Sequence, residues 1–96
     1  MADKIRVNYP ALEDMANHCQ MVSERLMQTG ATAQKIAGQM QNGALMGPPG
    51  EVYVQALNLF VTRVGKLAGK FAEEANDIRQ AMSEMQQADN AAGNNF

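Results

Sequence analysis

The sequence is short of the residues on which most catalytic and metal sites depend. Its 96 residues include one cysteine, one histidine and no tryptophan, and aromatic residues make up 5% of the chain. A single cysteine, Cys19, excludes an internal disulfide and a cysteine-rich zinc module. A single histidine excludes most hydrolytic triads and metal sites built on several imidazoles. We therefore expect no enzymatic activity, no metal site and no cofactor.

The net charge is small, and long apolar runs are also scarce. The formal net charge is -2, whereas nucleic-acid-binding proteins gather lysine and arginine on one surface, so we expect no nucleic-acid partner. Residues 1–10 contain no apolar stretch of the kind found in signal peptides. The longest apolar, uncharged run, 52–62, is too short to cross a bilayer. These patterns predict a soluble protein that is made in the cytoplasm without a leader.

Helix-breaking residues are concentrated in one place. Asn8 is a suitable helix cap, and Pro10 fits the first helical turn, where its missing N–H is not needed. The next proline belongs to Gly47-Pro48-Pro49-Gly50, which follows Gly43. We therefore predict a single domain, 1–96. It consists of a helix over 10–42, a turn over 43–50, a helix over 51–89 and a flexible tail over 90–96.

Both proline-free stretches place apolar residues at alternating steps of three and four, which is typical of coiled-coil helices. The first stretch carries Leu12, Met15, Cys19, Val22, Leu26, Thr29, Ala33, Ile36 and Met40. The second carries Tyr53, Leu57, Phe60, Val64, Leu67, Phe71, Glu74, Ile78, Ala81 and Met85. Because the turn between them is short, the helices must run antiparallel. The pattern predicts an all-α, antiparallel two-helix hairpin with these two series along its seam.

A second stripe lies beside each series and makes the apolar face wider than a two-helix seam requires. It contains Val54, Val61, Ala68, Ala75 and Met82 in the second stretch and Ala16, Ser23, Gly30 and Ala37 in the first. We therefore predict that two hairpins join in a four-helix bundle that buries both stripes. The residues expected at the dimer and bundle interface are Met15, Cys19, Val22, Leu26, Ile36, Leu57, Phe60, Val61, Val64, Leu67, Phe71 and Ile78.

The partner in such a bundle is either a second copy or a paired paralogue. One chain supplies both a bulky and a small stripe, so the two can complement each other across a symmetric contact. We prefer the homodimer for this reason, and the heterodimer stays open.

Three segments resemble one family of small helical-hairpin proteins. Residues 5–10 are similar to its lead into the first helix, and Gly-Glu-Val-Tyr at 50–53 is similar to the opening of its second helix. At the turn, Leu45-Met46-Gly47 falls where the family has Trp-x-Gly, with Leu45 in place of the tryptophan. On these residues the chain resembles the Trp-x-Gly (WXG) family, the early-secreted-antigen-like substrates of type VII (ESX) secretion.

The resemblance implies a function. Members of this family leave the cytoplasm as folded dimers without a leader, driven by the secretion ATPase of the type VII system. Their export motif is a tyrosine followed four residues later by an acid, and Met85 with Asp89 has that spacing here. The resemblance thus implies a secreted protein with its export signal at Met85 and Asp89. The alternative is a cytoplasmic helical adaptor or chaperone that holds a partner's helix in a methionine-rich groove.

Overall fold

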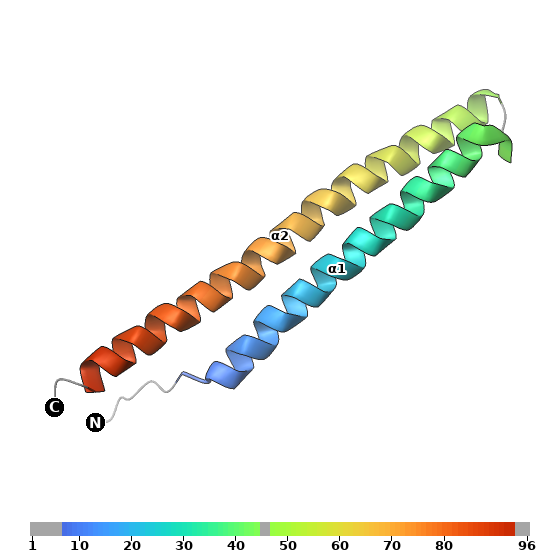
Figure 1. The fold of residues 1–96 in the computed structure, drawn as a ribbon. Helices are drawn as coiled ribbons and strands as arrows, with labels where there is room; N and C mark the ends of the chain where they lie inside the picture. The colour runs from blue at the N-terminus through green and yellow to red at the C-terminus, as the bar shows by residue number, and fades with distance from the viewer. Residues whose placement is uncertain (1–6, 45–46, 94–96) are drawn as a thin grey trace.

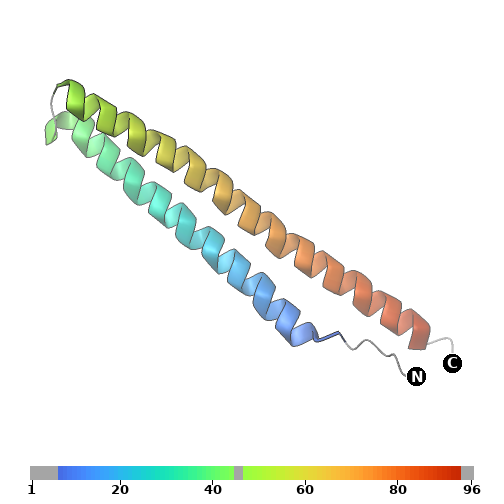
Figure 2. The ribbon, with the colours of Figure 1, turned by 180° about the vertical axis from the view of Figure 1, so that it is seen from behind.

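The chain forms two long helices that lie side by side and run antiparallel (Figures 1 and 2). They are seen in a computed structural model, which describes residues 7–44 and 47–93. Helix α1 covers Tyr9–Gln39 and helix α2 covers Pro48–Gly93. One turn of π-helix, η1 (Met40–Ala44), follows α1. The arrangement confirms the predicted all-α helical hairpin.

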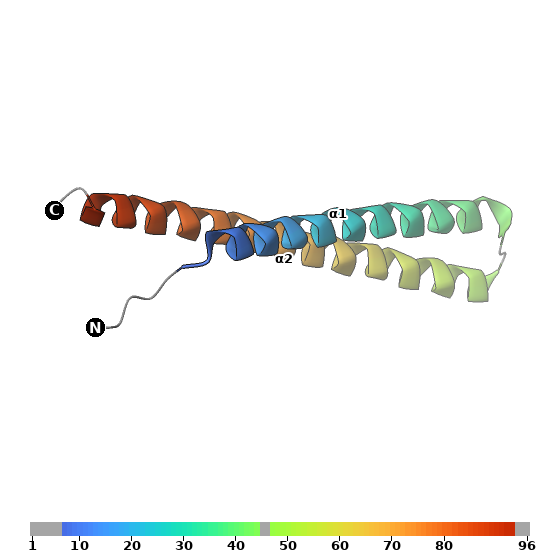
Figure 3. The same ribbon diagram turned by 90° about the horizontal axis from the view of Figure 1, so that it is seen from below.

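The hairpin is a thin rod. Its principal extents are 75 × 18 × 15 Å and its radius of gyration is 21.8 Å, whereas a compact domain of this length has a radius of gyration of about 12 Å. Seen from below, the two helices cross at a shallow angle and separate slightly toward their ends (Figure 3). Apart from the short turn η1, the described part of the molecule consists of these two helices and three residues at their ends. Each long helix therefore packs against one other helix and has a wide surface facing away from it.

Helix α1 begins as the sequence predicts. The Asn8 side chain accepts a hydrogen bond from the Ala11 backbone N–H at 3.0 Å, and the Leu12 N–H donates to the Asn8 carbonyl oxygen at 3.1 Å. These bonds satisfy donors that a helix start otherwise leaves free. Tyr9 is thereby fixed as the first residue of α1, one position before the predicted start.

Helix α2 begins three residues earlier than the predicted 51. Pro48 and Pro49 form its first turn, where a missing N–H costs nothing. Gly47 has a φ of 88°, a conformation that glycine adopts without strain. Its carbonyl oxygen accepts from the N–H groups of Gly50 and Glu51 at 3.1 and 3.2 Å. Residues 48–50 of the predicted turn are therefore helical, because Gly47 accepts the first hydrogen bonds of α2 and the prolines form its first turn.

The far end of α2 also differs from the prediction. The helix runs to Gly93, so 90–93, predicted as flexible tail, is helical. Ala91 and Ala92 favour this extension because alanine has the highest helix propensity. Residues 94–96 of the predicted tail lie outside the described residues.

The seam between the helices is built mainly from the small stripe. The buried residues are Ala16, Ser23, Gly30, Ala33 and Ala37 on α1 and Gly50, Val54, Val64, Ala68 and Ala75 on α2. The bulky series, which we predicted as the seam, contributes Ala33 and Val64 and otherwise stays half-buried or exposed. The helices therefore meet along the small stripe and not along the bulky series, which corrects the predicted seam.

Small side chains occupy the seam because they let the two backbones come close. A Cβ atom added to Gly30 would lie 3.5 Å from Val64 Cγ1. Nearby, the Ser23 hydroxyl donates to the Ala68 carbonyl oxygen at 2.8 Å across the seam. A bulky residue between only two helices would stay exposed to water on one side. It would therefore bury only part of its apolar surface and gain less free energy from a place in the seam.

This seam has little hydrophobic content. Among the described residues, the buried apolar side chains are five alanines and two valines. Burial contributes about 0.8 kcal/mol per CH₂ group, so each alanine adds little. An isolated hairpin therefore has few large apolar contacts to stabilise it.

Candidate functional site

One flank of the hairpin carries large apolar side chains that the seam does not cover. Rows spaced by multiples of seven lie on both helices, and antiparallel pairing brings the two rows to the same side of the seam. We call this surface the apolar flank, and its members are Met15, Val22, Ile36, Tyr53, Phe60 and Leu67. Met15 is 55% exposed and Tyr53 is 53% exposed. Val22 is half-buried.

The total surface of the chain is large for its mass. It exposes 7429 Å², whereas a compact monomer of 10.4 kDa exposes about 5,400 Å². The excess of about 2,000 Å² exceeds the roughly 800 Å² per partner that a standard protein interface buries. The elongated shape of the rod accounts for this excess, and it leaves enough surface for an interface of standard size.

The predicted interface residues fall into three groups. Val64 is buried in the seam, and Met15, Ile36, Phe60 and Leu67 are exposed. The remaining residues are half-buried, and these are Cys19, Val22, Leu26, Leu57, Val61, Phe71 and Ile78. The half-buried residues border the seam, so the hairpin covers one side of each and leaves the other side open.

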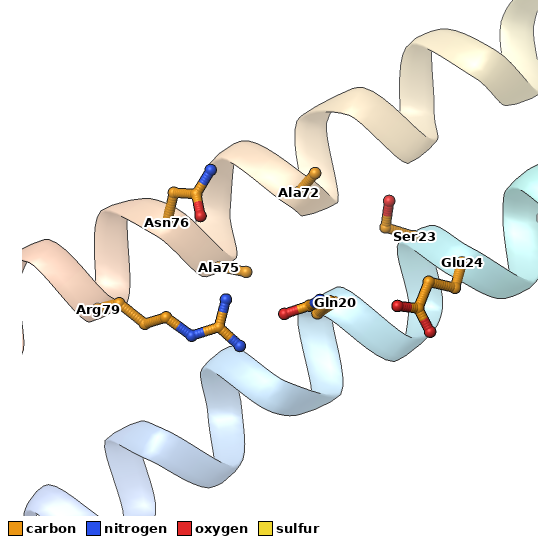
Figure 4. A pocket seen from close by; sticks show the side chains of 7 residues that line it. All are labelled: Gln20, Ser23, Glu24, Ala72, Ala75, Asn76 and Arg79. Carbon is orange, nitrogen blue, oxygen red and sulfur yellow. The ribbon is translucent and has the colours of Figure 1, made fainter.

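The opposite flank is polar over residues 20–24 and 72–79, although Met27, seven residues after Gln20, is also exposed on that side. An open cleft of about 280 Å³ lies there between the helices (Figure 4). Its lining residues are Gln20, Ser23, Glu24, Ala72, Ala75, Asn76 and Arg79. Small-molecule sites are usually enclosed and mostly apolar, and this cleft is neither. We call its charged and amide side chains, Gln20, Glu24, Asn76 and Arg79, the polar flank.

Arg79 ties the polar flank to α1. Its Nη2 donates to Asn17 Oδ1 at 3.1 Å, and Figure 4 shows its guanidinium reaching from α2 toward α1. The stem of Arg79 covers part of the seam while its head stays accessible to water. The polar flank is thus a solvated side of the rod, held by a polar bridge between the helices.

The predicted export signal lies at the open end of the hairpin. Met85 is half-buried and Asp89 is exposed. The Tyr9 hydroxyl donates to Asp89 Oδ2 at 2.5 Å. This hydrogen bond, with smaller effects from burial and the Asp89 charge, raises the pKa of Tyr9 above its usual 10.0. Sequence reasoning missed this pair, although Tyr9 and Asp89 continue the two small stripes at seven-residue spacing.

Two residues of the predicted turn motif, Leu45 and Met46, lie outside the described residues. The third, Gly47, is exposed and starts the reversal into α2. On the α1 side the described chain ends in the π-helical turn η1. Such turns are uncommon and mark local departures from regular helix.

Within 7–44 and 47–93, no group of three or more histidine, cysteine or acidic side chains could hold a metal ion. No helix formed by the described residues combines the length and apolar character needed to span a membrane. Cys19 is a free, half-buried thiol.

Comparisons with known protein families, with curated proteins and with solved structures found no match for this chain.

Proposed function

We propose that the chain is a small, non-enzymatic substrate of type VII (ESX) secretion, related to the WXG family and exported as a folded homodimer. The observation that carries this proposal is the apolar flank, which runs along a helical hairpin and has no cover within the described chain. The segments at 5–10, 45–47 and 50–53, which resemble that family, supply the link to secretion.

The exposed side chains of the apolar flank support dimerisation. Two copies placed flank to flank would bury Phe60, Leu67 and their neighbours between four helices. The large side chains would then have walls on all sides, as in the core of a four-helix bundle. A paired paralogue with a similar flank would form the same contact. The homodimer is the simpler assembly, since both apolar rows are already present on one chain.

Recognition by the secretion ATPase is assigned to the last turns of α2. Met85 and Asp89 are four residues apart and therefore share one face of the helix. They offer an apolar side chain and an acid at the end of the rod, away from the turn. In the proposed dimer this end is distant from the middle of the flank, so folding and recognition involve separate parts of the chain.

The export experiment compares secretion in strains with and without the type VII ATPase. Met85→Ala and Asp89→Ala should each lower the amount in the culture supernatant, while size-exclusion chromatography of the cytoplasmic pool shows unchanged dimers. Ser83→Ala and Gln86→Ala are matched controls, since both residues are exposed on the same turns of α2. Equal secretion of all four variants would place the signal elsewhere. Secretion that does not depend on the ATPase would contradict the proposal.

The second candidate is a cytoplasmic adaptor or chaperone. Exposed methionines on α1, namely Met15, Met21 and Met27, favour it because flexible thioether side chains adapt to varied partners. The same strains separate the two functions. An adaptor stays in the cells with or without the ATPase, and its purified form binds an amphipathic helix as a monomer.

A further inference from the structure

The open end of the hairpin is closed by a pair of side chains that come from opposite ends of the chain. Tyr9 lies seven residues before Ala16, and Asp89 lies seven residues after Met82. Both positions therefore continue the seam. At this last layer an aromatic ring and a carboxylate meet, joined by the bond from the Tyr9 hydroxyl to Asp89 Oδ2. We call this pair the end clasp.

Asp89 is poorly placed for its own helix. It lies near the C-terminus of α2, where the helix dipole is negative and an acid is destabilising. The last turn of α2 has no basic residue to offset it, as far as the described chain extends. Without a partner, this acid would favour fraying of the final turns.

The same acid is well placed for the neighbouring helix. Because the helices are antiparallel, the Tyr9 contact holds Asp89 at the N-terminal end of α1, where a negative charge is favourable. The described first turn of α1 has no acid of its own. The Asn8 cap fixes the backbone of Tyr9 at the start of α1. The hydroxyl that donates to Asp89 is therefore carried by an ordered residue.

We infer that Tyr9 is a positioning residue for the recognition surface at the end of α2. Its hydroxyl holds the Asp89 carboxylate and so keeps the turns that carry Met85 and Asp89 helical and docked on α1. The bond occupies one of several acceptor sites of the carboxylate, and Asp89 is exposed. The acid therefore remains accessible to a partner while the clasp fixes its place. The role in export rests on the proposed function, whereas the clasp itself does not.

The test removes only the hydroxyl. Tyr9→Phe keeps the ring and deletes the donor, and Tyr53→Phe makes the same change at the other tyrosine, which is exposed and far from this end. Asp89→Asn keeps an acceptor oxygen but removes the charge, so it separates the hydrogen bond from the acid. Amide hydrogen exchange of the full-length protein, followed by NMR over 82–93, reports the order of the final turns.

Tyr9→Phe should speed exchange over 86–93 about two- to tenfold, the factor expected from one hydrogen bond of ordinary net strength. Tyr53→Phe should leave exchange over 86–93 unchanged, and Asp89→Asn should not speed it. Equal exchange in wild type and Tyr9→Phe would overturn the clasp. Circular dichroism on each variant shows whether the rest of the hairpin is intact.

The secretion assay then tests the positioning role. Tyr9→Phe should lower export by a similar factor although Asp89 is unchanged, and Asp89→Asn should lower export although the helix stays ordered. Faster exchange with wild-type or increased export would overturn the role of Tyr9 in recognition. If Met85→Ala and Asp89→Ala are both exported normally, the proposed function of this surface fails, while the exchange data still decide the clasp.

Discussion

The two flanks of the hairpin are built from the same two helices and face opposite ways, yet they differ in what they can do. On the polar flank, Arg79 bridges to Asn17, and Gln20, Glu24 and Asn76 are exposed to water. On the apolar flank, Tyr53, Phe60 and Leu67 stand about half exposed. The polar flank is a solvated surface, whereas the apolar flank exposes large side chains that would gain free energy from being covered. This difference is the reason why we place the proposed interaction surface on one side of the rod.

The contrast is sharpest between neighbours in the sequence. Ala68 is 2% exposed in the seam, and Leu67 is 45% exposed on the apolar flank. The smaller residue thus holds the hairpin together, and the larger one is available for association. Substitutions at these two positions should therefore have different consequences, which the following predictions use.

The largest effect is expected in the seam. Ala68→Asp would place a charge where two backbones approach, with no partner for it. Burying a polar group without a hydrogen bond costs about 2–7 kcal/mol, which is comparable to the stability of a small domain. We expect loss of the helical signal in circular dichroism at room temperature and micromolar concentration. A variant that keeps wild-type helicity would show that α1 and α2 do not depend on this contact.

The next effect separates association from folding. Leu67→Asp changes an exposed residue, so the hairpin itself loses little. In a dimer joined by the apolar flank, the new charge would be buried without a partner, which costs about 2–7 kcal/mol for a polar group without a hydrogen bond, and a homodimer contains the residue twice. We expect a dimer dissociation constant raised by about tenfold or more, measured by sedimentation.

Asn76→Asp is the matched control on the polar flank. It adds the same charge at an exposed position of α2 and should leave the dissociation constant unchanged. Equal weakening by Leu67→Asp and Asn76→Asp would indicate a general effect of charge and would contradict the assignment of the interface to the apolar flank.

Much of the fold could be predicted from the sequence, because its determinants are local. The Asn8 cap, the proline-free stretches and the seven-residue spacing each act within one or two helical turns. Local patterns could not tell whether the small stripe or the bulky series forms the seam. They are adjacent on each helix, and residue volume favoured the bulky series for the seam. The outcome depends on how near two helices approach when no third element covers them.

Local sequence patterns could not predict the end clasp either. Tyr9 and Asp89 are 80 residues apart, and their contact depends on the register of the hairpin. That register is set by the turn and by seam contacts such as Ser23 with Ala68. The one available signal was the continuation of both small stripes to these positions. It becomes meaningful only when the small stripe is recognised as the seam.

A smaller, stabilising effect is expected where the two helices come closest. Gly30→Ala adds a methyl group that would meet Val64 Cγ1 at 3.5 Å, an ordinary contact distance. Alanine is favoured over glycine within a helix by about 0.8–1.0 kcal/mol. We expect a gain of about 0.5–1 kcal/mol in the free energy of unfolding, measured by denaturant titration. Gly65→Ala, with no atom within 4 Å of the new Cβ, is the control without a seam contact. A loss of stability for Gly30→Ala alone would mean that the seam is tighter than this.

The smallest effect concerns the end clasp and pH. The neutral Tyr9 hydroxyl donates to Asp89, and this bond raises the pKa of Tyr9 above 10.0. A raised folded-state pKa means that the clasp contributes its full stabilisation below pH 10 and that this stabilisation is lost as pH rises through the folded-state pKa.

The chain has two tyrosines, so Tyr53→Phe leaves Tyr9 as the only phenol. Its phenolate absorbance should appear with a midpoint above pH 10.0. Adding Asp89→Ala should move the Tyr9 midpoint back toward 10.0, because it removes the hydrogen-bond acceptor and the carboxylate charge together. A Tyr9 midpoint that does not change when the Asp89 carboxylate is removed would show that the two ends of the chain are not joined in solution.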